Sequence, residues 1–218
     1  MLSKYKINKV LEALEALYPD AKAELDFETP FQLLVATVLS AQCTDVRVNI
    51  VTKSLFPLIP NPEALRDLPI ATLEKIIKPC GLYKSKAKNL HEAAESIVGR
   101  FNSAIPEDIE TLMTLPGVGK KTANVVASNA FGVPAIAVDT HVFRVSNRIG
   151  LAEATTVEKT EIQLMDNLPK KKWSKIHHMI IFHGRRVCKA RNPQCDLCTI
   201  SPWCIYFDMQ KQNLRIEG

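Results

Sequence analysis

Hydrophobic residues recur along most of the chain at the three- and four-residue spacing of amphipathic helices. The first stripe ends before Pro19 and consists of Ile7, Val10, Leu11, Leu14 and Leu17. Thr29 and Pro30 then form a typical helix start, an N-cap followed by proline at the first helical position. The helix that follows, residues 31–41, is apolar on almost every side. This pattern predicts the central buried helix of the protein.

Further helical stripes follow at residues 48–55, 73–77, 87–98, 109–113, 125–130, 140–148 and 173–181. Thr155 and Glu158 have the spacing of a capping box, which predicts a helix that reaches about residue 168. Residues 133–138 read as an extended buried segment, but no β-hairpin pattern and no repeat is present. We therefore expect an all-α fold with about ten helices.

One turn between two predicted helices is a candidate anion site. Residues 115–123 read LPGVGKKTA, and Pro116 ends the helix before them. Gly117 and Gly119 permit unusual backbone angles and close approach of a ligand to the main chain. The free N–H groups at the start of the next helix can then bind an anion such as phosphate. The alternative is a plain turn between two helices.

Four of the six cysteines lie close together near the C-terminus. Cys188, Cys195, Cys198 and Cys204 leave gaps of six, two and five residues. Four thiolates at this density suit tetrahedral zinc or a [4Fe–4S] cluster. Structural zinc usually uses two close Cys pairs, and only one such pair is present here. The spacing therefore favours the iron–sulfur cluster. Arg191, in the six-residue gap, could meet phosphates or belong to a solvated loop.

Composition and charge narrow the function classes only a little. The chain has 218 residues and a formal net charge of +5, which fits a polyanion partner without requiring one. Charged residues interrupt every apolar run, and the N-terminus leads into an amphipathic pattern rather than an apolar signal core. We expect a cytoplasmic protein with one or two domains and no membrane partner.

Three motifs in order resemble one known family. Residues 115–123 match its helix-hairpin-helix motif, and residues 138–145, VDTHVFRV, look like the segment that carries its essential aspartate. The six-two-five cysteine spacing matches its iron–sulfur signature. Together these motifs resemble bacterial endonuclease III, a DNA glycosylase with lyase activity, over nearly the whole chain. The chain lacks the long N-terminal extension of eukaryotic relatives, so we expect a bacterial, nucleoid-associated protein.

The resemblance implies two helical lobes with a DNA-binding cleft between them. One lobe of about six helices would span residues 22–133 and hold the hairpin motif at about 109–128. The other would join residues 1–21 to 134–218 and carry the [4Fe–4S] cluster in the loop 188–204.

The resemblance also implies the catalytic pair. Lys121 matches the nucleophile, whose amine would bond to the sugar C1′ and form an imine, a Schiff base. Burial and the positive end of a helix would keep this amine neutral. From the sequence alone either Lys120 or Lys121 could serve, and an exposed helix lysine is more often a solvated charge. Asp139 matches the activating carboxylate, although an aspartate there is also a good N-cap.

Other positions match the family's DNA contacts. Gln42 corresponds to the residue that fills the gap left by the flipped nucleotide, and Leu82 corresponds to a wedge on the opposite strand. By themselves, Gln42 would read as a surface residue and Leu82 as a core leucine. Asp45 and His141 match positions that line the base pocket. The predicted phosphate contacts are the hairpin residues Pro116, Gly117, Val118, Gly119 and Lys120, together with Arg191 and the lysines Lys84, Lys86 and Lys88. The Arg191 loop carries less positive charge than is common in the family.

The function implied is base excision repair by a bifunctional glycosylase and abasic-site lyase. Its substrate would be double-stranded DNA that contains oxidised pyrimidines or abasic sites, and we expect the protein to act as a monomer. One alternative is a monofunctional, adenine-type mismatch glycosylase, which would lack a lysine at position 121 and would carry a further C-terminal domain. The other is a non-catalytic iron–sulfur DNA-binding protein.

Overall fold

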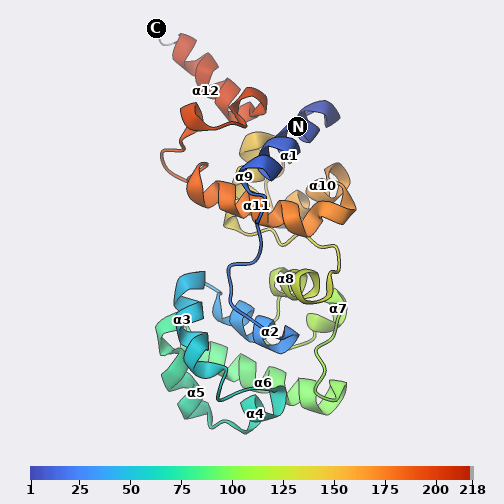
Figure 1. Cartoon of the computed structure of the whole chain (residues 1–218), viewed down its shortest axis with the longest axis vertical. Helices are drawn as coiled ribbons and strands as arrows, with labels where there is room; N and C mark the ends of the chain where they lie inside the picture. The colour runs from blue at the N-terminus through green and yellow to red at the C-terminus, as the bar shows by residue number, and fades with distance from the viewer. Residues whose placement is uncertain (217–218) are drawn as a thin grey trace. The chain divides into compact units, whose positions relative to one another are not determined.

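The computed structural model describes residues 1–216 and the side chains of residues 1–212. Within these residues every regular element is an α-helix or a short 3-10 helix, so the predicted all-α class is confirmed (Figure 1). Contacts divide the chain into two units: Ala23–Ala135, and Met1–Lys22 together with the chain from Ile136 onward. The expected lobes, residues 22–133 and residues 1–21 with 134–218, stay a prediction. None of the described helices is long and apolar enough to cross a bilayer.

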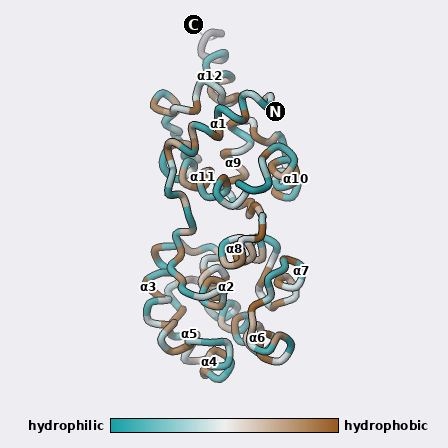
Figure 2. Tube along the Cα trace, turned by 45° about the vertical axis from the view of Figure 1, so that its right-hand side comes forward, coloured by the Kyte–Doolittle hydropathy of each residue, from teal (hydrophilic) through white to brown (hydrophobic). Residues whose placement is uncertain are grey.

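The continuous unit, Ala23–Ala135, contains seven α-helices, against about six implied by the resemblance. They are α2 (Pro30–Leu39), α3 (Asp45–Leu55), α4 (Pro62–Asp67), α5 (Ile70–Ile77), α6 (Tyr83–Phe101), α7 (Ile109–Leu112) and α8 (Lys120–Phe131). A 3-10 turn, η1 (Lys78–Cys80), connects α5 to the segment before α6. The chain is banded with alternating polar and apolar residues along most helices (Figure 2), as expected when each helix packs one face.

Helix α2 is the central helix of this unit, as its sequence predicts. The Thr29 hydroxyl accepts from the Gln32 N–H at 3.2 Å, and Pro30 occupies the first turn. Eight of the ten residues in α2 are buried, because α3, α6 and α8 pack around it. Each fully buried leucine of this kind contributes about 1.5–3 kcal/mol. The packing of this core therefore holds α2 and α8 in fixed positions.

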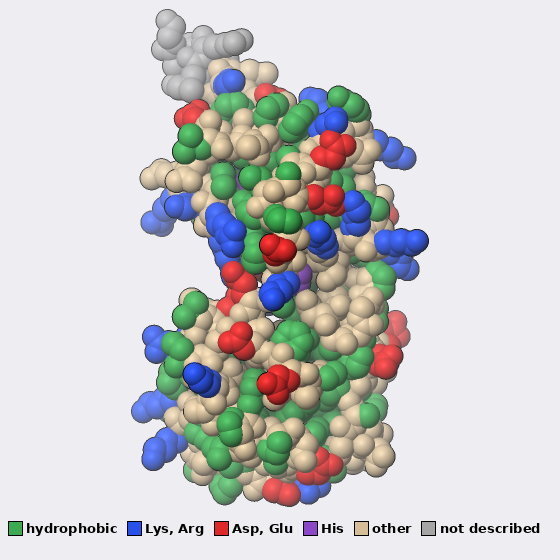
Figure 3. Space-filling model, viewed as in Figure 1, with side chains coloured by type: hydrophobic (Ala, Val, Ile, Leu, Met, Phe, Trp, Pro, Cys, Tyr) green, Lys and Arg blue, Asp and Glu red, His purple; other side chains and the backbone are tan. Residues whose placement is uncertain are grey.

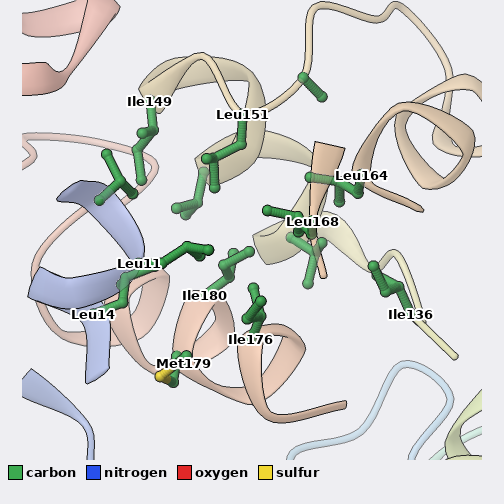
Figure 4. Close-up of a cluster of buried hydrophobic side chains, with 14 of the residues drawn as sticks. Leu11, Leu14, Ile136, Ile149, Leu151, Leu164, Leu168, Ile176, Met179 and Ile180 are labelled. Atoms are coloured by element: carbon green, nitrogen blue, oxygen red, sulfur yellow. The ribbon is translucent and has the colours of Figure 1, made fainter. Parts of the chain in front are cut away.

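The second unit is built around the packing of α9 (Thr140–Ile149) on α11 (Trp173–Arg186). Its other helices are α1 (Lys4–Leu17), α10 (Val157–Asn167) and α12 (Ile205–Ile216), with 3-10 turns η2 (Lys170–Lys172), η3 (Cys195–Leu197) and η4 (Ser201–Trp203). Leu11 and Leu14 of α1 meet Ile176, Met179 and Ile180 of α11 in the core (Figure 4). The N-terminal segment thus completes a core whose other residues begin at Ile136, more than 120 positions after Leu14.

The predicted start of α10 is wrong by one residue. Thr156, not Thr155, is the N-cap, and its hydroxyl accepts from the Lys159 N–H at 3.3 Å. Two adjacent threonines offer the same cap chemistry, and only the path of the chain from the preceding loop selects between them.

Candidate functional site

The turn before α8 needs glycine at one of its two glycine positions. Gly117 has φ +75°, and a Cβ there would lie 2.7 Å from the Cβ of Asn89 on α6. Gly119 has φ −84° and ψ 173°, which any residue adopts, so the expectation of an unusual backbone at Gly119 is wrong. A Cβ on Gly119 would meet nothing within 4 Å. The protein itself therefore gives no steric reason for glycine at 119, and open space lies in front of the helix.

The first turn of α8 presents backbone donors and two lysines. Gly119 is the N-cap, and no side chain accepts a capping hydrogen bond at the start of α8. Leu115 and Val118 are buried beneath the turn, and the Val118 N–H donates to the Leu115 carbonyl at 3.1 Å. Lys120 and Lys121 are exposed. The turn is thus anchored by apolar residues and offers positive charge outward, as an anion site requires.

Lys121 is exposed in the free protein. The expectation that the protein buries this amine is therefore wrong for the described structure. Any further removal of water from Lys121 has to come from a bound ligand.

Asp139 is the N-cap of α9 and is half-buried. Its Oδ1 accepts from the Val142 N–H at 2.8 Å, which fixes the carboxylate against the helix start. Lys121 belongs to the unit Ala23–Ala135 and Asp139 to the other unit, so each side chain is positioned by separate packing. The cap that sequence reasoning offered as an alternative is present, and it is compatible with a catalytic carboxylate because it holds the group in place.

The two predicted pocket residues lie at helix starts. Asp45 is the first residue of α3, half-buried and next to the N-cap Thr44. His141 is half-buried in the first turn of α9, with its Nδ1 3.3 Å from Nη2 of Arg144. Each belongs to a different unit, and their meeting at one substrate stays a prediction.

Gln42 and Leu82 both lie in exposed loops with left-handed backbone. We call residues 40–43 the Gln42 loop and residues 81–82 the Leu82 loop. Gln42 has φ 53° and Leu82 has φ 47°. Leu82 is 59% exposed, so reading it as a core leucine is wrong. A left-handed residue with a Cβ costs about 1–2 kcal/mol, and it persists only where the surroundings hold it.

Lys86 holds both loops, and its prediction as a phosphate contact is wrong. The side chain is only 4% exposed, and Nζ donates to three carbonyl oxygens: Leu39 at 2.8 Å, Ala41 at 2.7 Å and Cys80 at 2.8 Å. Burial lowers the pKa of Lys86, and the neighbouring thiols of Cys43 and Cys80 oppose that shift. Lys84 and Lys88 on the same helix are exposed, as the prediction requires.

All four C-terminal cysteines line one hollow in the second unit. The hollow contains about 340 Å³ of space, part of it open to solvent, and Ile149, Pro193 and Tyr206 also line it. Burial raises the pKa of Cys204 to about 11 and raises the pKa of Cys195 and Cys198 as well. Within the described residues no three His, Cys, Asp or Glu side chains converge as closely as a single metal ion requires. The four thiols therefore line one hollow without forming a compact site for a single ion.

Two arginines that sequence reasoning missed fix the first part of the cysteine loop on α9. Arg144 Nη2 donates to the carbonyls of Gly184 at 3.0 Å and Cys188 at 3.1 Å. Arg148 donates to the carbonyls of Lys189 at 2.7 Å and Ala190 at 3.0 Å. Their four-residue spacing on the helix after Asp139 places both on one face, and that spacing was the available signal.

Arg191 is exposed in the same loop, so its role toward phosphate stays a prediction. Over the face drawn in Figure 3, basic and acidic side chains are interspersed on both units. The net positive charge therefore forms no single basic patch on that face, and local groups have to identify the DNA contacts.

Comparison with known proteins gives a consistent family. The family described as HhH-GPD superfamily base excision DNA repair protein matches residues 35–170. The chain is 46% identical over 201 residues to Endonuclease III of Rickettsia conorii, covering 92% of this chain and 96% of that protein. It is 46% identical over 205 residues to Endonuclease III of Bacillus subtilis, covering 94% of each. A solved structure of a trapped covalent intermediate between endonuclease III and DNA matches with 46% identity and a TM-score of 0.92, covering 97% of this chain and 100% of that one. With these similarities over nearly its whole length, this chain belongs to the endonuclease III family, within the HhH-GPD superfamily of base excision DNA repair proteins.

Proposed function

We propose that this protein is a bifunctional DNA glycosylase and abasic-site lyase that removes oxidised pyrimidines and cleaves the strand through a lysine imine. The observation that carries the proposal is the exposed amine of Lys121 on the first turn of α8. The relative trapped as a covalent intermediate with DNA supports the same chemistry. The protein acts as a monomer on double-stranded DNA.

The hairpin anchors the DNA backbone without reading sequence. A phosphate accepts from the N–H groups at the start of α8, and Lys120 adds a cation beside it. The missing Cβ at Gly119 allows the phosphate to approach the main chain. Main-chain donors recognise phosphate in any sequence, which suits an enzyme that has to act anywhere in the genome.

Lys121 then performs the covalent step. Its neutral amine forms a bond to C1′ of the extruded nucleotide, and the bond from C1′ to the base breaks, so the base leaves with the bonding electron pair and takes up a proton. Loss of a proton from the nitrogen and opening of the sugar ring give the imine. Removal of a proton from C2′ then expels the 3′ phosphate by β-elimination. Contact with the substrate supplies the desolvation that the free protein does not give this amine.

Asp139 activates the amine and stabilises the developing positive charge on the sugar. Its Oδ1 is oriented by the Val142 N–H, so the carboxylate does not have to be ordered at the moment of reaction. Gln42 fills the space of the extruded nucleotide, Leu82 enters the stack opposite, and Asp45 and His141 line the pocket for the damaged pyrimidine. Arg191 contacts a phosphate.

We also propose that Cys188, Cys195, Cys198 and Cys204 hold a [4Fe–4S] cluster. The four soft thiol donors line one hollow, which suits a cluster larger than a single ion. When bound, the cluster supplies a covalent cross-link between η3, η4 and the end of α11. Arg144 and Arg148 connect this loop to α9 through their hydrogen bonds to the Cys188 and Lys189 carbonyls. Asp139 caps the first turn of the same helix.

Borohydride trapping on a duplex with one abasic site tests the enzyme. We expect a covalent adduct from the parent protein and from Lys120→Gln, and no adduct from Lys121→Gln although that variant still binds DNA. An adduct that persists in Lys121→Gln would move the nucleophile elsewhere. DNA binding with no adduct from the parent protein would indicate a binding protein without lyase activity.

Metal analysis tests the cluster separately. About four irons and four sulfides per chain are expected. Stoichiometric zinc would overturn the assignment without affecting the proposal for Lys121.

A further inference from the structure

The buried ammonium of Lys86 connects two loops that are far apart in sequence. An ammonium has three N–H donors and no acceptor, and each donor of Lys86 has one carbonyl partner. Two of these carbonyls, those of Leu39 and Ala41, belong to the end of α2 and the start of the Gln42 loop. The third, of Cys80, ends η1 immediately before the Leu82 loop. One side chain thus uses its full hydrogen-bonding capacity to join the two loops.

We propose that Lys86 is the positioning residue that holds Gln42 and Leu82 at a fixed separation for joint insertion into damaged DNA. The inference rests on the proposed function, because it concerns how that enzyme opens the base stack.

The backbone geometry explains how one side chain can control both loops. Gln42 directly follows Ala41, and Leu82 follows Cys80 by two residues, so each inserting residue is close to a carbonyl bound by Lys86. The backbone N–H of Lys86 also donates to the Leu82 carbonyl at 3.0 Å. Both inserting residues have a left-handed backbone, which the chain adopts only when it is held there. Lys86 supplies such a restraint on both sides.

The choice of a buried cation supports positioning rather than simple filling of space. An apolar side chain would fill the same volume without the penalty of removing a charge from water. It would also leave the carbonyls at the ends of α2 and η1 without donors. A positive charge at these helix ends is favoured by the helix dipole, and its three bonds fix direction as well as distance. The free-energy cost of burying the charge is thus offset by three hydrogen bonds, which also fix the conformations of both loops.

The test uses Lys86→Met, which keeps an unbranched side chain, one atom shorter, and removes all three donors. Lys75→Met, at an exposed position on α5 of the same unit, is the matched control. The probe is a duplex with a stable abasic analogue and 2-aminopurine opposite the gap, whose fluorescence reports unstacking. We expect Lys86→Met to bind this duplex about tenfold more weakly and to lose most of the fluorescence change, because binding then has to order the two loops at a cost of about 1.4 kcal/mol. Lys75→Met should keep the fluorescence change.

A double-mutant comparison separates positioning from general stability. In a background that carries Gln42→Ala and Leu82→Ala, the same Lys86→Met change should weaken binding by less than about twofold, because no inserting side chains remain to be placed. An equal loss in both backgrounds would overturn the proposal. So would a variant that melts earlier but binds and unstacks DNA as the parent does.

Two further arms keep the result interpretable. If Lys86→Met does not fold, Lys86→Gln retains two donors and should give an intermediate loss of the fluorescence change; parental fluorescence and binding in that variant would overturn the proposal. Borohydride trapping with the parent protein is run in parallel. If the parent forms an adduct and Lys86→Met weakens binding equally in both backgrounds, only the positioning role of Lys86 is refuted. If the parent forms no adduct, the proposed lyase activity is refuted.

Discussion

Replacing single glycines by alanine at three positions separates folding from DNA contact. At Gly117 the new Cβ would be held at φ +75° and would lie 2.7 Å from the Asn89 Cβ, an atom next to the backbone of α6. The left-handed backbone costs about 1–2 kcal/mol, and overpacking adds about 1–3 kcal/mol. We therefore expect Gly117→Ala to lose about 2–5 kcal/mol, which in a chain of this size lowers Tm by roughly 4–20 °C.

Gly119→Ala should behave in the opposite way. Its φ of −84° and the open space around it mean that the folded protein loses only the modest N-cap advantage of glycine, about 1 kcal/mol or less. The added methyl group instead occupies the space through which a phosphate approaches the first turn of α8. The loss of one charge-assisted hydrogen bond of about 1.5 kcal/mol corresponds to roughly tenfold weaker binding.

Gly99→Ala is the control for both variants. Gly99 lies within α6 with nothing within 4 Å of an added Cβ, so alanine should stabilise the helix by about 0.5–1 kcal/mol. Thermal unfolding measures Tm for all three, and fluorescence anisotropy with an abasic-site duplex measures Kd on protein that is fully folded. Parental binding by Gly119→Ala would refute close approach of phosphate at that residue. A Gly117→Ala variant as stable as the parent would refute the steric account of the turn.

Three other changes have distinct expected outcomes. Asp139→Asn keeps a good N-cap, so Tm should change little while single-turnover lyase activity falls by about 10²–10⁴-fold; equal activity would remove Asp139 from the mechanism. Arg148→Met removes the bonds to the Lys189 and Ala190 carbonyls, so a chelator should extract iron from the proposed cluster several-fold faster than in the parent, and an unchanged rate would contradict this role. Burial lowers the pKa of His178 to about 4 from 6.5. Between pH 4 and pH 6.5 the unfolded chain therefore binds a proton at His178 that the folded chain does not bind. The contribution of this residue to the free energy of unfolding is fully present above pH 6.5 and falls by up to about 3 kcal/mol as the pH is lowered toward 4. Denaturant unfolding of His178→Gln should show a shallower acid loss than the parent, and an identical slope would contradict the assignment.

Sequence alone determined the features that depend on neighbours in the chain. Caps such as Thr29 and Asp139 were readable because the hydroxyl or carboxylate bonds to an N–H only three residues away. The hairpin and the spacing of the cysteines are likewise local patterns. These short-range rules gave the helical class and the turn before α8, whereas the resemblance to endonuclease III gave the candidates Lys121 and Asp139.

Only the tertiary structure decided what depends on partners far along the chain. Lys86 looks in the sequence like its exposed neighbours Lys84 and Lys88, and its burial follows from carbonyls up to 47 positions away. Gly117 and Gly119 look equivalent, yet only Gly117 faces Asn89 of another helix. The exposure of Leu82 and the hold of Arg148 on the cysteine loop are of the same kind. The residue type determines which interactions a side chain can make, but the packing of distant helices determines which group it contacts.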